Sequence, residues 1–284
     1  MIGPPGIGTQ RRSARLESAG LDGVTVNWEE EGEGLPVVLV HGLPTSSRLW
    51  RHVIPLVSGG RCLAWEMLGY GSSIPEGIGR DISVSRQADY LLAWMDSVNI
   101  RRAIFVGHDL GGGVVQIAAV RRPGACAGLV LTNSICYDSW PVPIVRAVRA
   151  AGPLLERLPN PVFKPTFFPV FYFTHDNGRR AAESARVHWN GYATHHAAAA
   201  FVRQIRSLDV RDTIAVAHEL PHLNLPARVV WGAADGFLKV GYGERLARDL
   251  GTTLERIEGG KHFTPEDHPE RIAAAVNDLL REAG

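Results

Sequence analysis

Short runs of apolar residues alternate along the chain with longer segments in which apolar and polar residues are mixed. Five runs rich in Val, Ile and Leu predict buried parallel strands, over residues 36–40, 61–65, 103–107, 128–132 and 228–231. Amphipathic segments predict helices over residues 82–98, 112–122, 243–250 and 269–283, and residues 25–29 predict one arm of an antiparallel hairpin. This alternation predicts an α/β fold, with a mostly parallel sheet that carries helices on both faces.

The alternation stops between residues 137 and 217, where the chain becomes rich in proline, histidine and aromatic residues. We interpret residues 137–217 as a helical cap (lid) inserted between two strands, which shields a pocket at the carboxyl ends of the sheet. A free-standing second domain is the alternative, although an apolar segment of roughly 80 residues favours a partner surface that covers it. The core domain would then comprise residues 15–136 and 218–284, preceded by a loose N-terminal tail over residues 1–14.

Composition is that of an ordinary globular protein and points to no particular macromolecular partner. The 284 residues are 45% hydrophobic and 21% charged, with a net charge of +1, so no basic excess favours nucleic acid. No apolar run approaches the roughly 20 residues that cross a bilayer, and no apolar signal segment follows Arg11-Arg12. Three scattered cysteines, Cys62, Cys126 and Cys136, indicate a reducing cytoplasmic location. The oligomeric state stays open between monomer and homodimer.

The strongest local signal for chemistry is the segment Gly107-His108-Asp109-Leu110-Gly111. It connects an apolar strand to a helix, which is the context of the nucleophile elbow G-x-S-x-G, with Asp109 in the place of serine. Such a sharp turn leaves no room for side chains beside the nucleophile, which explains the glycines. Taken alone, the segment also fits an ordinary strand-to-helix turn with an aspartate N-cap.

Two further residues follow in the order acid and then histidine, each after a strand. Asp235 follows the strand at 228–231, and His262 follows the next apolar segment, which ends at Ile257. The order nucleophile, acid, histidine is that of α/β-hydrolases. The three residues are therefore predicted to be a catalytic nucleophile, an orienting acid and a general base.

From about Thr25 to the C-terminus, apart from the cap, the chain resembles the epoxide hydrolase and haloalkane dehalogenase branch of the α/β-hydrolase superfamily. His41-Gly42-Leu43-Pro44 is similar to the His-Gly-x-Pro oxyanion loop of that branch, and Thr45-Ser46-Ser47 with Trp50 is especially like dehalogenases. Residues 68–73 resemble a Gly-rich turn that is common across the superfamily, preceded by Glu66 where Asp is usual.

An aspartate nucleophile favours attack at a saturated carbon, because attack on an ester or amide would give a strained anhydride, whereas attack on an alkyl carbon gives an ordinary ester. His262, held by Asp235, would then activate the water that hydrolyses the ester on Asp109. Backbone N–H groups of Leu43 and Leu110 would form the oxyanion hole.

The leaving group separates the possible substrates. The resemblance implies that a dehalogenase carries halide-binding Trp or Asn donors where this chain has Leu110 and Leu43. We therefore expect an epoxide hydrolase that forms a vicinal diol, with haloalkane dehalogenase as the alternative. A ligand-binding protein with little turnover is the second alternative.

Several residues are candidates for supporting roles around the nucleophile. An epoxide oxygen needs an acid, which the resemblance assigns to a cap tyrosine; Tyr172, Tyr192 and Tyr137 are the candidates, although a single Tyr is more often a packed aromatic. Further pocket candidates are His41, Pro44, His108, Trp140 and Trp189, the last two as possible halide donors. The cap histidines lack metal-ligand spacing, so no metal or other cofactor is expected. The apolar cap indicates a small hydrophobic substrate, with water as the co-substrate.

Overall fold

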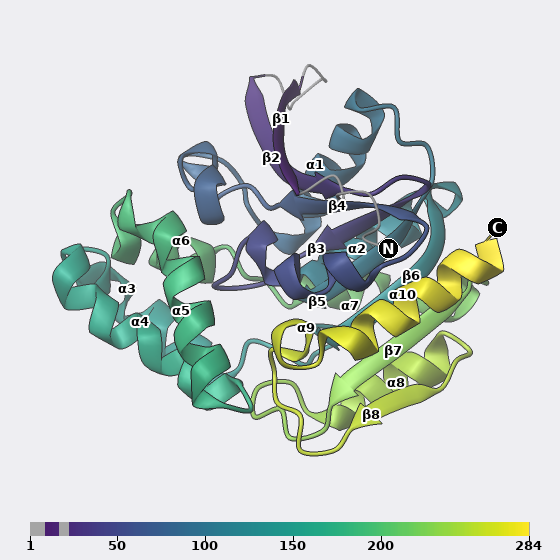
Figure 1. Ribbon diagram of the computed structural model, residues 1–284. Helices are drawn as coiled ribbons and strands as arrows, with labels where there is room; N and C mark the ends of the chain where they lie inside the picture. Colours follow the sequence, from purple (N-terminus) through teal and green to yellow (C-terminus); the bar gives the residue numbers. More distant parts are fainter. Residues whose placement is uncertain (1–8, 17–22, 284) are drawn as a thin grey trace, which may run out of the picture.

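The computed structural model describes residues 9–16 and 23–283, in which one eight-stranded sheet forms the centre of the molecule (Figure 1). The strand order is β1-β2-β4-β3-β5-β6-β7-β8. The strands are β1 (Gln10–Leu16), β2 (Val24–Glu31), β3 (Leu35–Val40), β4 (Gly60–Glu66), β5 (Ala103–Asp109), β6 (Cys126–Ser134), β7 (Ala227–Gly232) and β8 (Leu254–Ile257). Only β2 runs antiparallel to its described neighbours, β1 and β4, whereas the pairs from β4 to β8 are parallel. The predicted α/β fold is confirmed.

Helices cover both faces of this sheet. The core helices are α1 (Val84–Ser97), α2 (Leu110–Arg121), α8 (Val240–Asp249), α9 (Thr264–Asp267) and α10 (Pro269–Ala283). In β3, Val38 and Val40 pack in the core that contains residues of α1, α2 and α8, whereas Val37 and Leu39 pack in the core that contains residues of α10. Because side chains of a strand point alternately to opposite faces, a strand buried on both faces needs a continuous apolar run.

The N-terminal hairpin corrects one prediction. Residues 10–16 form β1, which pairs with β2 from Gln10 opposite Glu30 to Leu16 opposite Val24, so the expected loose tail over residues 1–14 is wrong from Gln10 onward. Residues 1–8 of that tail lie outside the described residues. The strand carries mostly exposed polar side chains, so its sequence has no apolar alternation, and pairing of backbone groups along the sheet edge orders it.

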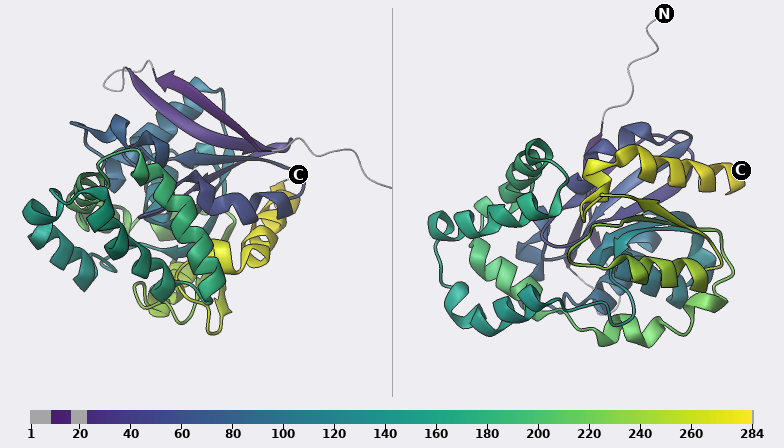
Figure 2. Two further views of the ribbon diagram at one scale, coloured as in Figure 1. Left: turned by 60° about the vertical axis from the view of Figure 1, so that its left-hand side comes forward. Right: turned by 90° about the horizontal axis from the view of Figure 1, so that it is seen from below.

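Five helices lie between β6 and β7: α3 (Pro143–Leu155), α4 (Asn160–Thr174), α5 (Gly178–Ala193), α6 (Ala197–Arg206) and α7 (Arg211–Val216). In Figures 1 and 2, α3 to α6, coloured teal to green, gather together beside the sheet. Aromatic side chains pack α4 against α5, with the ring of Phe167 centred 5.0 Å from Tyr192 and 5.4 Å from Trp189. None of the helices in the described part of the chain has the length and apolar character needed to cross a membrane.

Candidate active site

Asp109 lies at the sharp turn between β5 and α2. Its backbone has φ 50° and ψ −121°, a left-handed conformation that is unusual for a residue with a side chain. The turn brings α2 against β3 so closely that a Cβ on Gly111 would lie 2.1 Å from the Val40 carbonyl oxygen. This close approach of α2 to β3 explains why the turn needs glycine, as the sequence predicted.

The carboxylate of Asp109 is held by backbone donors. The N–H of Leu43 donates to Asp109 Oδ2 at 2.8 Å, and the N–H of Leu110 also donates to this carboxylate. Gly42 makes the approach possible, because a Cβ there would lie 2.3 Å from Asp109 Oδ2. Burial raises the pKa of Asp109, while the charge of His262 and the two N–H donors act in the opposite direction. Both predicted oxyanion donors thus lie beside the carboxylate.

His262 and Asp235 form a buried pair. His262 Nδ1 lies 2.8 Å from Asp235 Oδ2, so an ionised Asp235 accepts the Nδ1 proton and leaves Nε2 without one in the neutral ring. Burial lowers the pKa of His262, but the charge and hydrogen bond of Asp235 and the charge of Asp109 outweigh it, and the pKa is raised. Burial raises the pKa of Asp235, yet His262 and further hydrogen bonds lower it overall.

Asn133, at the end of β6, is a site residue that the sequence analysis missed. Its Nδ2 donates to Asp235 Oδ2 at 2.7 Å, and its Oδ1 accepts from the backbone N–H of Gly232 at 2.9 Å. The N–H groups of Phe237 and Leu238 donate to the other oxygen of Asp235 at 2.7 and 3.1 Å. The polar run Thr132-Asn133-Ser134 at the carboxyl end of a buried strand was the available signal, because functional side chains collect there in parallel sheets.

Asp109 and His262 face a common cavity of about 110 Å³, which we call the inner cavity. Its walls come from strand ends of the core and from α3, α4 and α6, and they are almost entirely apolar. The lining residues are Leu43, Pro44, Asp109, Leu110, Ile135, Trp140, Val142, Val145, Val148, Val170, Phe201, Ile205, Leu208, Phe237, Leu238 and His262. The arrangement brings together a carboxylate, an imidazole and space for a small hydrophobic molecule.

None of the three candidate tyrosines is among the residues described as lining the inner cavity. The Tyr137 hydroxyl donates to Asp249 Oδ2 at 2.7 Å, and the buried Tyr192 hydroxyl donates to Gln204 Oε1 at 2.6 Å. Tyr172 is half exposed on the outer side of α4. The hydroxyls of Tyr137 and Tyr192 are thus committed to other partners, so the prediction of a tyrosine acid gains no support from this geometry.

The other pocket candidates divide into two groups. Pro44 and Trp140 line the inner cavity, but the Trp140 indole N–H donates to Thr213 Oγ1 at 2.8 Å and is not free for a halide. Trp189 packs among the aromatic rings of α4 instead.

His41 and His108 lie behind the site and do not line the cavity. His41 Nε2 accepts from the N–H of Met67 at 3.1 Å, and His108 Nε2 donates to the carbonyl oxygen of His262 at 2.9 Å. Burial lowers the pKa of each histidine to about 3, so both are neutral at ordinary pH. They fix the backbone around the site.

A second polar cluster is centred on the fully buried Glu266 of α9. His175 Nε2 lies 2.8 Å from one carboxylate oxygen, and His188 Nε2 lies 3.1 Å from the other, to which Arg51 also donates. The ring of Phe263 separates this cluster from the active site, with centroids 4.6 Å from His175 and 5.1 Å from His262. No group of three His, Cys, Asp or Glu side chains in the described ranges is arranged to hold a metal ion.

Comparison with known proteins decides the family. The model of the alpha/beta hydrolase fold family matches residues 36–269. The chain belongs to the α/β-hydrolase fold family. It is a hydrolase of this family, and the match spans both the elbow at Asp109 and the strand ends that carry Asp235 and His262.

The named relatives include haloalkane dehalogenases, which confirm the resemblance to the dehalogenase and epoxide hydrolase branch. A haloalkane dehalogenase of Agrobacterium fabrum is 29% identical, with 92% of this chain and 90% of that protein covered. A 2-hydroxymuconate semialdehyde hydrolase of Pseudomonas sp. is 27% identical, with 92% of each chain covered.

Solved structures agree on the fold. An α/β hydrolase fold protein from Burkholderia ambifaria has a TM-score of 0.83 at 28% identity, covering 95% of this chain and all of that one. A haloalkane dehalogenase from Bradyrhizobium elkani has a TM-score of 0.74 at 23% identity, covering 97% of this chain and 98% of that one.

Proposed function

We propose that this α/β-hydrolase cleaves a bond at a saturated carbon of a small hydrophobic substrate through a covalent alkyl ester on Asp109. The observation that carries the proposal is the placement of the Asp109 carboxylate, bonded to backbone N–H groups, in an apolar cavity that it shares with His262. Helices α3, α4 and α6 act as a lid that excludes bulk water from this cavity.

In the first step an oxygen of the ionised Asp109 attacks the substrate carbon. A carbon–oxygen bond forms, and the bond to the leaving group breaks with its electron pair going to that group. For a haloalkane, the products are an alkyl ester and a halide ion. No base is needed in this step, because the attacking carboxylate carries no proton.

In the second step water hydrolyses the ester. His262 Nε2 removes a proton from water as its oxygen attacks the ester carbonyl carbon, and Asp235 stabilises the imidazolium that forms. The N–H groups of Leu43 and Leu110 stabilise the oxyanion. Collapse of the intermediate transfers the proton from His262 to the departing alcohol and leaves Asp109 as a carboxylic acid. This acid then releases its proton to water, which restores the carboxylate. The net reaction converts a haloalkane and water into an alcohol, a halide ion and a proton.

Between the two substrates, a haloalkane is better supported than the epoxide that the sequence favoured. An opening epoxide releases an alkoxide, which needs a proton donor, and no tyrosine is among the described residues that line the cavity. Bromide and iodide leave without protonation. They suit a cavity that also lacks a free indole N–H, because they demand less stabilisation than chloride. The dehalogenase relatives point the same way.

One observation keeps epoxide hydrolysis as the second candidate. The pKa of His262 is raised, in spite of burial, by Asp235 and Asp109. An imidazolium at this position could protonate the epoxide oxygen and then serve as the base in the second step.

The test is to trap the ester. We expect His262→Gln to accumulate a butyl adduct on Asp109 after incubation with 1-bromobutane, detected by intact mass and peptide mapping. The control Asp109→Asn should stay unmodified. Release of bromide by the unmodified protein should exceed diol formation from 1,2-epoxybutane. Diol formation without bromide release would reverse the ranking of the substrates, and the lack of an adduct with both compounds would contradict the covalent mechanism.

A further inference from the structure

A second, larger cavity opens beside the inner cavity, between the start of α3 and the loop that follows β7. It has a volume of about 700 Å³, and we call it the outer cleft. It shares Trp140, Val142 and Phe237 with the inner cavity, so these side chains form the boundary between the two. The ring of Phe237 lies 5.6 Å from that of His262, which places this boundary directly beside the general base. Only these side chains therefore lie between the inner cavity and the outer cleft.

Two cations line the outer cleft without an ion pair. Arg146 and Lys239 are both exposed, and neither forms an ion pair with any residue in the described part of the chain. The carboxylate in this cleft, Asp138, already accepts a hydrogen bond from Tyr242. The cleft thus presents an excess of positive charge at a distance from the carboxylate of Asp109.

The position of these cations in their helices is electrostatically unfavourable. Lys239 is the N-cap of α8 and Arg146 lies one turn into α3, and neither helix has an acidic residue in its first turn or a side-chain cap. Helix N-termini carry partial positive charge and favour anions. Both cations would be stabilised by an anion held in the cleft between them.

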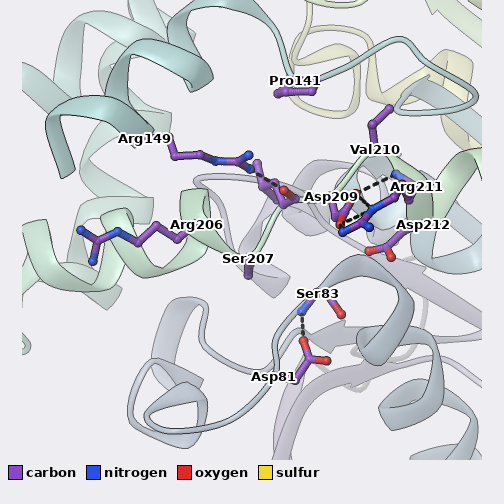
Figure 3. Close-up of a pocket in the computed structure, with 11 residues that line it drawn as sticks. Asp81, Ser83, Pro141, Arg149, Arg206, Ser207, Asp209, Val210, Arg211 and Asp212 are labelled. Carbon is purple, nitrogen blue, oxygen red and sulfur yellow. Dashed lines mark hydrogen bonds and ion pairs between the residues drawn. The ribbon is translucent and has the colours of Figure 1, made fainter. Parts of the chain in front are cut away.

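Another charged cavity, of about 680 Å³, lies near α6 and α7, but its cations already have partners (Figure 3). Its three arginines are already engaged: Arg211 pairs with Asp209, Arg206 pairs with Glu156, and Arg149 donates to the backbone carbonyl oxygens of Ile205 and Leu208. It shares only Leu208 with the inner cavity. The outer cleft is therefore the better place for a charged part of the substrate.

We propose that the physiological substrate is an ω-substituted carboxylic acid, whose carboxylate binds Arg146 and Lys239 in the outer cleft while its apolar chain passes Phe237 to reach Asp109. This proposal rests on the proposed function only for the attack of Asp109 on the substituted carbon; the binding of the carboxylate does not depend on it. The apolar inner cavity receives the carbon that Asp109 attacks, and the cationic cleft determines which molecules place that carbon correctly.

The test compares 6-bromohexanoate with the uncharged 1-bromohexane. We expect kcat/KM for the acid to fall about tenfold in the double variant Arg146→Ala/Lys239→Ala, mainly through KM, and to change less than about twofold for the bromoalkane. Added salt should weaken the preference for the acid in the unmodified protein but not in the variant. The matched control is Arg101→Ala/Arg102→Ala, which removes two exposed arginines before β5, at the opposite end of the strand from Asp109.

A binding measurement separates the two proposals. Hexanoate, which cannot react, should bind the unmodified protein more tightly than the Arg146→Ala/Lys239→Ala variant in calorimetric titration, whether or not Asp109 is alkylated. Equal affinity, together with equal kcat/KM for the acid in both proteins, would overturn the charged-substrate proposal and leave the adduct on Asp109 as a separate result. Weaker hexanoate binding in the variant without any adduct would support the cleft and reject the reaction.

Discussion

At the scale of single residues, Asn133 connects the acid of the site to the sheet. It donates to Asp235 Oδ2 and accepts from the N–H of Gly232, so it links the end of β6 to the loop after β7. We expect Asn133→Ala to slow hydrolysis of the Asp109 ester about tenfold while the alkylation rate stays nearly constant, because only the second step uses Asp235. Rapid-quench kinetics with 1-bromobutane separates the two rates. Equal slowing of both steps would indicate a general structural defect instead.

The charge state of His262 leads to a second prediction. Burial lowers its pKa, but Asp235 and Asp109 raise it above 6.5. The ester on Asp109 carries no charge, so in this intermediate Asp235 alone raises the pKa of His262. Protonated His262 cannot accept a proton from water, so the rate of ester hydrolysis should fall as the pH falls through the pKa that His262 has in the intermediate. In Asp235→Asn the inflection should move to lower pH, and the maximum rate should drop by about a hundredfold or more. Single-turnover hydrolysis followed across pH checks both expectations; an unchanged inflection would contradict the role of Asp235.

Sequence reasoning at this scale succeeded where the backbone constrains the residue. The glycines around Asp109 and the strand ends before Asp235 and His262 fix where these side chains lie, and the structure brings all three together. The tyrosines were not predictable in this way. Whether a hydroxyl of a packed helix faces a cavity or an internal partner such as Gln204 depends on helix packing, which no local pattern records.

At the scale of elements, Glu266 joins the helices between β6 and β7 to the segment after β3. Its carboxylate on α9 receives His175 from the end of α4 and His188 from α5, as well as Arg51 from the segment after β3. Burial raises the pKa of Glu266, but these partners outweigh burial and hold the pKa well below 4.5. This cluster is therefore a buried polar link between α4, α5 and the part of the molecule that contains the sheet.

We expect Glu266→Gln to lower the free energy of unfolding by about 3 kcal/mol, because it leaves buried cationic and polar partners without their common carboxylate. The matched control Glu270→Gln changes an exposed residue of α10 and should cost about 0.5 kcal/mol or less. Urea unfolding at neutral pH measures both variants. Equal stabilities of the two would show that the cluster contributes little.

Buried strands were easier to predict from the sequence than exposed ones. Strands such as β3 and β5 lie inside the sheet, covered on both faces, so their apolar runs predict them within a few residues. The edge strand β1 is held by backbone bonds with mostly polar side chains outward, and the same reasoning mistook it for a tail. A pattern of apolar and polar residues indicates which strands are buried, but it does not reveal backbone hydrogen bonds at the edge of a sheet.

At the scale of the whole molecule, buried neutral histidines lower the free energy of unfolding as the pH falls below 6.5. Burial lowers the pKa of His41 and His108 from 6.5 to about 3, and burial also lowers that of His188. Below pH 6.5 the unfolded chain binds protons at these positions that the folded chain does not. Their contribution to stability is therefore complete above pH 6.5 and is lost as the pH falls toward 3.

The pKa of His262 is raised, so its effect on stability has the opposite sign to that of the other histidines and appears only at higher pH. Its stabilising contribution is complete below 6.5 and is lost as the pH rises through the folded value, so it does not offset the loss on the acid side. We therefore expect His41 and His108 each to lower the free energy of unfolding by about 1.4 kcal/mol per pH unit below pH 6.5. Burial raises the pKa of Asp267 to about 6, so this carboxyl opposes the fall below pH 6. Urea unfolding between pH 7.5 and 5 measures the slope in the unmodified protein and in His108→Asn. His108→Asn should reduce the slope by about 1.4 kcal/mol per unit, and an unchanged slope in this variant would show that the ring of His108 is protonated in the folded state.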